Sequence, residues 1–192
     1  MERIQWPGKL KVRIVLLLAL AANLCAQDVL VLKEGNVITL TGGGRAKDLL
    51  MTPDDYTAVL SKFDLQSKTR KTGDVTLDDY LKYAGEQVVE WTPDESKIMG
   101  EIIASIGSKI KTLGLNLKMQ DTIQLIKSTM INEGGADGYT RGSYIVLKDK
   151  YVGTKSERLE ALVTHELFHV LSRYDKAMSE RVYNTLGFKN CN

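Results

Sequence analysis

The stretch "TKSERLEALVTHELFHVLSRY", residues 154–174, constrains the fold of this chain more than any other. Thr154 and Glu157 have the spacing of a capping box, and no glycine or proline follows them, which predicts one helix over residues 155–174. A helix with apolar side chains nearly all round it is buried, so other elements must cover this one. Its apolar residues are Ala161, Leu162, Val163, Leu167, Phe168, Val170 and Leu171.

Both histidines of the chain, His165 and His169, fall on this predicted helix, and Glu166 directly follows the first. Four residues advance a helix by about 6 Å and slightly more than one turn, so the two rings stack on one face. Such a pair can converge on one zinc ion at about 2.1 Å from each nitrogen, with Glu166 beside it as a proton acceptor. The alternative is a chance match in which hydrogen bonds satisfy the three side chains. The spacing favours a zinc site.

At these residues the chain resembles the zincin metallopeptidases, whose signature H-E-x-x-H is matched by His165, Glu166 and His169. The longer metzincin signature has a third histidine, which this chain lacks. The resemblance is therefore to the gluzincins, in which an acidic residue on a following helix completes the site. It covers residues 138–188 and implies a zincin-like core, bound Zn2+, Glu166 as catalytic base, and a peptide or protein substrate.

The third zinc ligand is sought among the acidic residues after His169, which are Asp175 and Glu180. Asp175 has the position of an N-cap for a second helix. If that helix returns antiparallel to the first, Glu180 lies level with His169, and Tyr183 shares its face. We predict Glu180 as the third ligand and Tyr183 as a catalytic residue that stabilises the oxyanion. The alternatives are an exposed carboxylate, a tyrosine used for packing, and a ligand beyond the last residue.

Residues 1–26 have the pattern of a secretory signal peptide. A basic segment precedes the apolar run "IVLLLALAA", which is much shorter than the ~20 residues that span a bilayer, so a membrane anchor is the weaker alternative. Cleavage after Ala26 would leave 22 basic and 23 acidic residues, a balance that gives no reason to expect nucleic-acid binding. We predict a secreted or extracytoplasmic protein without a stable membrane span, in which Cys191 is the remaining cysteine.

The chain from residue 27 to residue 192 is predicted to form one zincin-like metallopeptidase domain of the α+β class. Its catalytic core, residues 93–192, contains a small antiparallel or mixed sheet, the active-site helix and the following helix. Residues 27–92 supply a hairpin and a mainly helical region. Two questions stay open: whether the core continues past the end of the chain, and whether residues 27–71 act as a propeptide over the cleft.

Local signals place the individual elements. Turn residues around Gly35 predict the hairpin over residues 28–40. Threonine caps followed by proline predict helices that begin near Pro53 and near Pro93, the second ending near Gly114, and a third helical pattern begins at Thr76. The remaining β-rich stretches are residues 122–131 and 138–152.

The segment "GYTRGSYIVL", residues 138–147, is predicted to be one edge strand beside the cleft, as in the zincins. A substrate peptide can add to such an edge through main-chain hydrogen bonds. Strict alternation would place Tyr139, Arg141 and Ser143 on one face, with Arg141 as an exposed charge rather than a substrate clamp.

Together these features predict a secreted zinc-dependent peptidase, in which a metal-activated water attacks the peptide bond and Glu166 is the general base. The rival hypothesis is a non-catalytic zincin-like binding protein that holds a peptide or protein partner.

Overall fold

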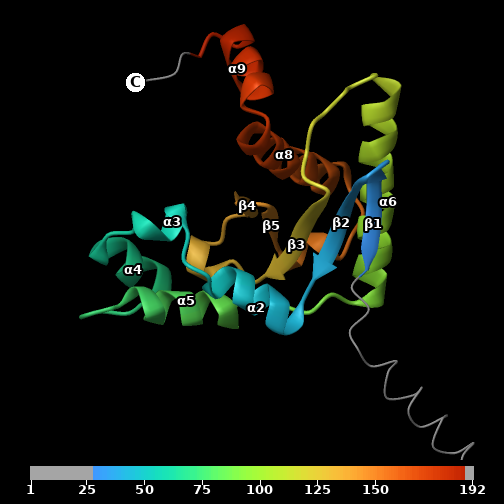
Figure 1. The fold of residues 1–192 in the computed structure, drawn as a ribbon. Helices are drawn as coiled ribbons and strands as arrows, with labels where there is room; N and C mark the ends of the chain where they lie inside the picture. The colour runs from blue at the N-terminus through green and yellow to red at the C-terminus, as the bar shows by residue number, and fades with distance from the viewer. Residues whose placement is uncertain (1–27, 189–192) are drawn as a thin grey trace, which may run out of the picture.

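The structure is a computed structural model that describes residues 28–188 (Figure 1). The predicted signal peptide and Cys191 lie outside these residues. The prediction of an α+β fold is confirmed. The elements are β1 (Val29–Lys33), β2 (Asn36–Thr41), α2 (Gly43–Met51), α3 (Asp55–Ala58), α4 (Lys62–Thr69), α5 (Leu77–Glu86), α6 (Pro93–Thr112), β3 (Thr122–Ser128), the 3-10 turn η1 (Ile131–Glu133), β4 (Gly138–Arg141), β5 (Tyr144–Lys148), α7 (Asp149–Val152), α8 (Glu157–Tyr174) and α9 (Lys176–Thr185).

The five strands form one mixed sheet in the order β1-β2-β3-β5-β4. The three central strands run parallel, while β1 and β4 lie antiparallel to their neighbours at the two edges. This sheet crosses the boundary that the sequence suggested at residue 92, because β1 and β2 precede it and the other strands follow it. The predicted N-terminal and catalytic parts therefore share one sheet.

Helices cover both faces of the sheet (Figure 1). Alternate residues of β3 show this directly, since Leu125 packs into the core under α6 and α8, whereas Ile126 packs into the core under α2, α4 and α5. The period of two along a strand sends neighbouring side chains to opposite faces. The motif helix α8 is thus packed on the sheet along one face. The expectation that it is covered nearly all round needs correction, because Ala161 is exposed and Leu162 and Phe168 are half-buried.

Two predicted helix starts are confirmed, and both rest on reciprocal capping. The Thr92 hydroxyl accepts from the amide of Glu95 while Pro93 occupies the first helical position of α6, and Thr76 caps α5 through the amide of Asp79. α6 ends at Thr112, close to Gly114, whose backbone is left-handed.

Four local predictions need correction. The first concerns "GYTRGSYIVL", which is a hairpin and not one strand, because Gly142 adopts φ +50° and turns the chain between β4 and β5. Residues 149–152 form the short helix α7 instead of continuing the strand. The short helix α3 is capped by Asp54, so it begins two residues later than Pro53. α8 is capped by Ser156, not by Thr154.

The helices α2 and α4 were not predicted. α2 follows the glycine run directly, without a side-chain cap, whereas α4 begins with reciprocal capping between Ser61 and Asp64. α2 therefore lacks the start signal that marks α5 and α6, whereas the signal of α4, Ser61 followed three residues later by Asp64, was overlooked.

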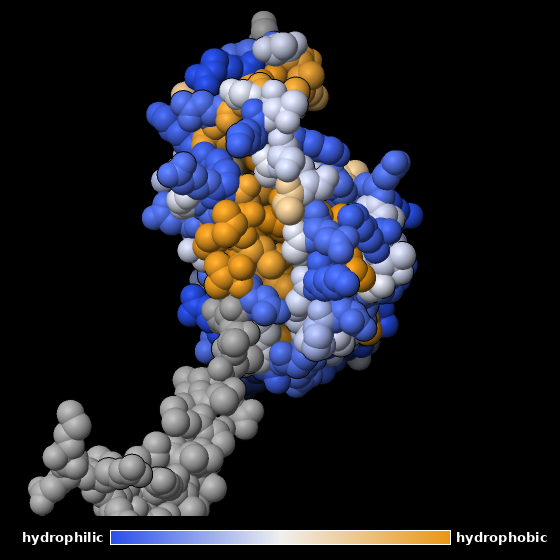
Figure 2. Space-filling view, turned by 90° about the vertical axis from the view of Figure 1, so that its right-hand side faces the viewer, coloured by the Kyte–Doolittle hydropathy of each residue, from blue (hydrophilic) through white to orange (hydrophobic). Residues whose placement is uncertain are grey.

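The edge strand β1 leaves apolar side chains on the surface of the molecule. Figure 2 shows the side of the molecule with α6 and β1, where apolar side chains gather on the surface. Val29 and Val31 of β1 are 58% and 66% exposed. Among residues 28–188, no helix is long and apolar enough to cross a membrane.

Candidate metal centre

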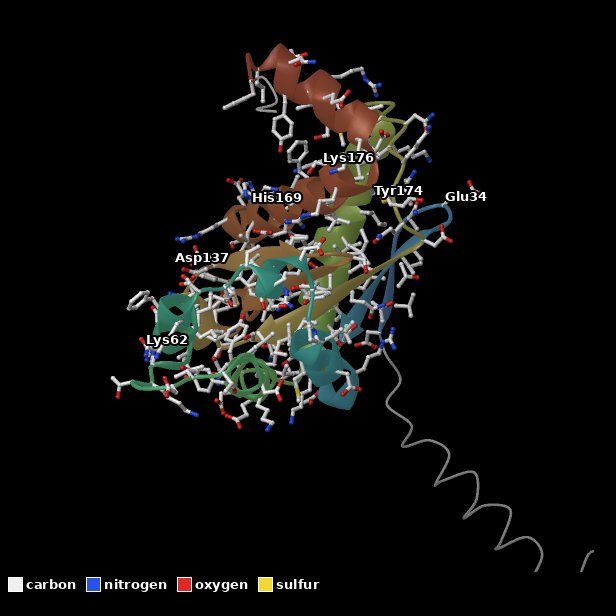
Figure 3. All side chains as sticks on the ribbon, turned by 60° about the vertical axis from the view of Figure 1, so that its left-hand side comes forward. Glu34, Lys62, Asp137, His169, Tyr174 and Lys176 are labelled. Atoms are coloured by element: carbon white, nitrogen blue, oxygen red, sulfur yellow. The ribbon has the colours of Figure 1, made fainter. Side chains whose placement is uncertain are left out.

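The two histidines lie together on one face of α8, as the spacing predicts. Their Nε2 atoms are 3.0 Å apart, and the rings stand nearly perpendicular at 87°. Both rings line one cavity of about 420 Å³. His169, labelled in Figure 3, lies five residues before Tyr174, where α8 ends.

Glu166 is buried between α8 and the edge strand β4. It is only 4% exposed, and its Oε2 accepts a hydrogen bond of 2.6 Å from the hydroxyl of Thr140. A Cβ added to Gly138 would lie 3.2 Å from Oε1 of Glu166 and equally close to Leu147, so glycine permits the strand to approach the helix here. The carboxylate is therefore held against β4 at the wall of the cavity.

The cavity is bordered by α8, β4, η1 and α3. The part of the chain far from the motif contributes Tyr56 of α3, which the sequence did not single out. Its lining residues are Tyr56, Glu133, Gly138, Tyr139, Thr140, Arg141, His165, Glu166, His169 and Arg173.

Glu133 is a second carboxylate at this cavity, with 11% of its side chain exposed, and it accepts several hydrogen bonds. Its two oxygens accept from the phenol of Tyr56 at 2.9 Å, the phenol of Tyr80 at 2.7 Å and the ammonium of Lys68 at 2.5 Å. The side chain of Asn132 donates to it as well. Burial next to this carboxylate raises the pKa of both phenols, so both hydroxyls stay protonated and donate.

Arg141 is buried, which corrects the expectation of an exposed charge. Its Nε donates to the carboxylate of Asp54 at 2.7 Å, and its Nη2 donates to the carbonyl of Thr52 at 3.3 Å. Burial alone would raise the pKa of Asp54, but the bonds from Arg141 and from the amide of Thr57 lower it below its ordinary value. The packing of β4 against the α3 region converts the predicted edge charge into an internal ion pair.

Glu180 and Tyr183 do not line the cavity of the two histidines. Figure 3 shows α9 leaving α8 between Tyr174, the last residue of α8, and Lys176, the first of α9. Glu180 is exposed on α9, and Tyr183 packs edge-on against Phe168 with 6.2 Å between ring centroids. No three His, Cys, Asp or Glu side chains within the described part of the chain are grouped so that they could hold a metal ion. The identity of the third ligand, Glu180 included, stays a prediction.

Asp175 has the predicted role, because its carboxylate accepts from the amide of Met178 and caps α9. The angle at which α9 leaves is set by the backbone of this residue (φ −106°, ψ 87°) and not by a helical pattern.

The donor chemistry of the histidine pair fits a zinc ion. Two nitrogens bound to one tetrahedral zinc at about 2.1 Å lie roughly 3.4 Å apart, close to the 3.0 Å between the Nε2 atoms. Burial lowers the pKa of His169, which favours the neutral imidazole that binds metals. The described residues thus supply two nitrogen ligands with a buried carboxylate beside them.

Comparison with protein families gives one match, to the eCIS core domain, over residues 126–177. The matched segment is about a quarter of the chain, and it contains η1, β4, β5 and α8, which supply most of the cavity wall. The match does not test the resemblance to the zincins. No curated protein and no solved structure matches this chain.

Sequence reasoning missed Tyr56, Glu133 and Arg173 at the cavity. Arg173 carries a signal that could have identified it, because it follows His169 by four residues on the same helix and so shares its face. Tyr56 and Glu133 carry no such signal, since only the tertiary packing brings them to α8.

Proposed function

We propose that this chain is a secreted zinc-dependent peptidase in which His165 and His169 hold Zn2+ and Glu166 is the general base. The observation that carries the proposal is the arrangement in one cavity of two histidine nitrogens 3.0 Å apart and a buried carboxylate. A carboxylate is costly to bury, and a cation close to it offsets that cost. Secretion rests on the sequence pattern of residues 1–26 alone.

The edge strand β4 supports a peptide as substrate. The amide of Lys148 donates to the carbonyl of Asp137, and this fixes which residues of β4 face β5. Because hydrogen-bonding direction alternates along an antiparallel strand, the main-chain groups of Gly138 and Thr140 face outward, away from β5. An extended peptide could pair with these groups beside the two histidines.

The roles of the residues follow from this geometry. A zinc ion between the histidines would supply Lewis-acid chemistry, polarising a peptide carbonyl and lowering the pKa of a water molecule. Glu166 accepts the proton of the attacking water and passes it to the nitrogen of the leaving amine. Thr140 holds Oε2 of this carboxylate, while Oε1 accepts no hydrogen bond from the described residues and is available for the proton.

Metal content is the first test. Elemental mass spectrometry of the purified protein after dialysis is expected to give about one zinc per chain. His165→Ala and His169→Ala should each lose the metal, and Glu180→Gln decides whether that carboxylate is the third ligand. A folded wild-type protein that binds no zinc would contradict the proposal.

Turnover is the second test, with a library of quenched fluorescent peptides as substrates. Glu166→Gln should keep the zinc and lose at least about 100-fold in rate, the usual contribution of a general base. A variant that cleaves at the parental rate would remove Glu166 from the mechanism. Zinc without any turnover in the wild-type protein would favour the binding-protein hypothesis instead.

A further inference from the structure

Arg141 is held rigidly and keeps one hydrogen-bond donor unused. Its guanidinium lies between the rings of Tyr56 and Tyr144, with Cζ 5.3 and 5.7 Å from their centroids, and Asp54 fixes its Nε. Within residues 28–188 the buried Nη1 has no hydrogen-bond partner. A buried donor without a partner costs roughly 1–3 kcal/mol, so this nitrogen favours an acceptor brought from outside the chain.

Arg173 brings a second guanidinium to the same cavity. It is exposed, lies on the histidine face of α8, and makes no ion pair with any described residue. Both arginines line the cavity of the two histidines, and both also line an outer hollow of about 520 Å³. The two hollows share Tyr56, Thr140, Arg141 and Arg173, so they meet around the arginines.

The acidic residues near the arginines leave Arg173 without a counter-charge of its own. Asp54 is engaged by Arg141 and by the amide of Thr57, while Glu133 is paired with Lys68. Glu166 also lines the inner cavity, where it accepts from Thr140 and forms no ion pair with any described residue. Asp55 lines only the outer hollow and is exposed. A carboxylate that enters between the hollows can therefore meet two guanidinium groups, which recognise this planar anion well.

We propose that Arg141 and Arg173 form a subsite for a carboxylate of the substrate, either an acidic side chain or the C-terminal carboxylate of a peptide. This inference rests on the proposed function, because the subsite is placed relative to a peptide along β4. Gly138 lies against Glu166, the proposed general base, and therefore marks the position of the bond that is cut. Arg141 follows Gly138 by three residues, about 10 Å along a strand. The recognised carboxylate thus lies about two to four residues from the bond that is cut.

The test is a specificity profile on a peptide library, with cleavage products sequenced by mass spectrometry. The wild-type protein should cleave peptides with glutamate at one fixed position about tenfold faster than those with glutamine. Free and amidated C-termini distinguish the two sources of the carboxylate. Arg173→Gln should abolish this preference, and Arg173→Glu should turn it toward lysine and arginine, a reversal that mere damage to the fold does not produce.

Arg181→Gln is the matched control, because Arg181 is an exposed arginine on α9 that lines neither hollow. It should leave the preference unchanged. Cleavage without any acidic preference, or a preference that survives Arg173→Gln, would overturn the subsite and leave the proposed function standing.

A protein that cleaves no peptide would count against the proposed function, and the subsite is then decided by binding. Titration of 15N-labelled Glu166→Gln protein with N-acetylglutamate should shift the Nε–H signal of Arg141, whereas N-acetylglutamine should not. Equal effects of the two compounds, or no effect of either, would overturn the subsite.

Discussion

Two carboxylates, Glu133 and Glu166, line the same cavity and differ in how many of their acceptor positions are filled. Glu133 accepts hydrogen bonds from two phenols, an ammonium group and an amide, whereas Glu166 accepts one side-chain hydrogen bond, from Thr140. A carboxylate with all its acceptor positions filled joins α3, α4 and α5 to η1. A carboxylate with a free oxygen can take a proton. The same residue type thus serves packing at one wall of the cavity and chemistry at the other.

The largest loss of stability is expected when Glu133 loses its ion pair with Lys68. Lys68→Met leaves the largely buried charge of Glu133 without its ion-pair partner and should lower the free energy of unfolding by about 3 kcal/mol, the lower end of the range for buried pairs, measured by urea denaturation. Lys62→Met is the control, because its pair with Asp74 is exposed and should change stability by less than about 1 kcal/mol. Equal losses in the two variants would show that the Glu133 network is not special.

Neutralising each carboxylate in turn tests the comparison directly. Glu133→Gln replaces acceptor positions by donors that face two phenols and an ammonium group, and should cost about 2–3 kcal/mol. Glu166→Gln keeps a carbonyl oxygen for the hydroxyl of Thr140 and should leave the unfolding free energy nearly unchanged. If both variants lost stability equally, the division between a packing and a chemical carboxylate would be wrong.

The ion pair between Asp54 and Arg141 should make the stability of the protein depend on pH. The folded-state pKa of Asp54 lies below its ordinary value. Its stabilising effect is therefore complete above the ordinary aspartate pKa of about 4, and it disappears as pH falls through the lower folded-state value. The melting temperature of the wild-type protein should exceed that of Asp54→Asn at pH 6, and the two should converge in acid. A constant difference down to pH 2 would contradict this linkage.

The smallest effect is expected at the hydroxyl that holds Glu166. Thr140→Val removes one buried hydrogen bond and should cost about 1 kcal/mol in a denaturant titration, without loss of zinc. Thr140→Ser restores the donor and should recover most of the stability. A valine variant that loses zinc would place Thr140 in metal binding rather than in positioning.

Local patterns predicted those parts of the fold that depend on neighbours in the sequence. The hairpin around Gly35, the start of α6 at Pro93 and the meeting of His165 with His169 each follow from spacings of a few residues. The β4–β5 turn at Gly142 was also locally marked, but the alternation on both sides of it concealed the break.

Contacts between distant segments were beyond the sequence. The partners of Glu133 lie 53 and 77 residues away at Tyr80 and Tyr56, and no period connects them. The position of Glu180 depends on the angle of α9, which one backbone turn at Asp175 determines. Arg141 was mistaken for a surface residue because the helix that covers it, α3, has only four residues and was placed too early.

The order of the strands determines how long β2 waits for its partner strand while the chain is being synthesised. β2 pairs in parallel with β3, Val37 opposite Thr122, so the partner strand is made 85 residues later. At about 5–20 residues per second, that interval lasts roughly 4 to 17 s. During this time the hairpin β1–β2 presents the unpaired backbone and apolar side chains that β3 and α6 later cover. The nascent hairpin is therefore a segment on which a holding chaperone would have several seconds to act.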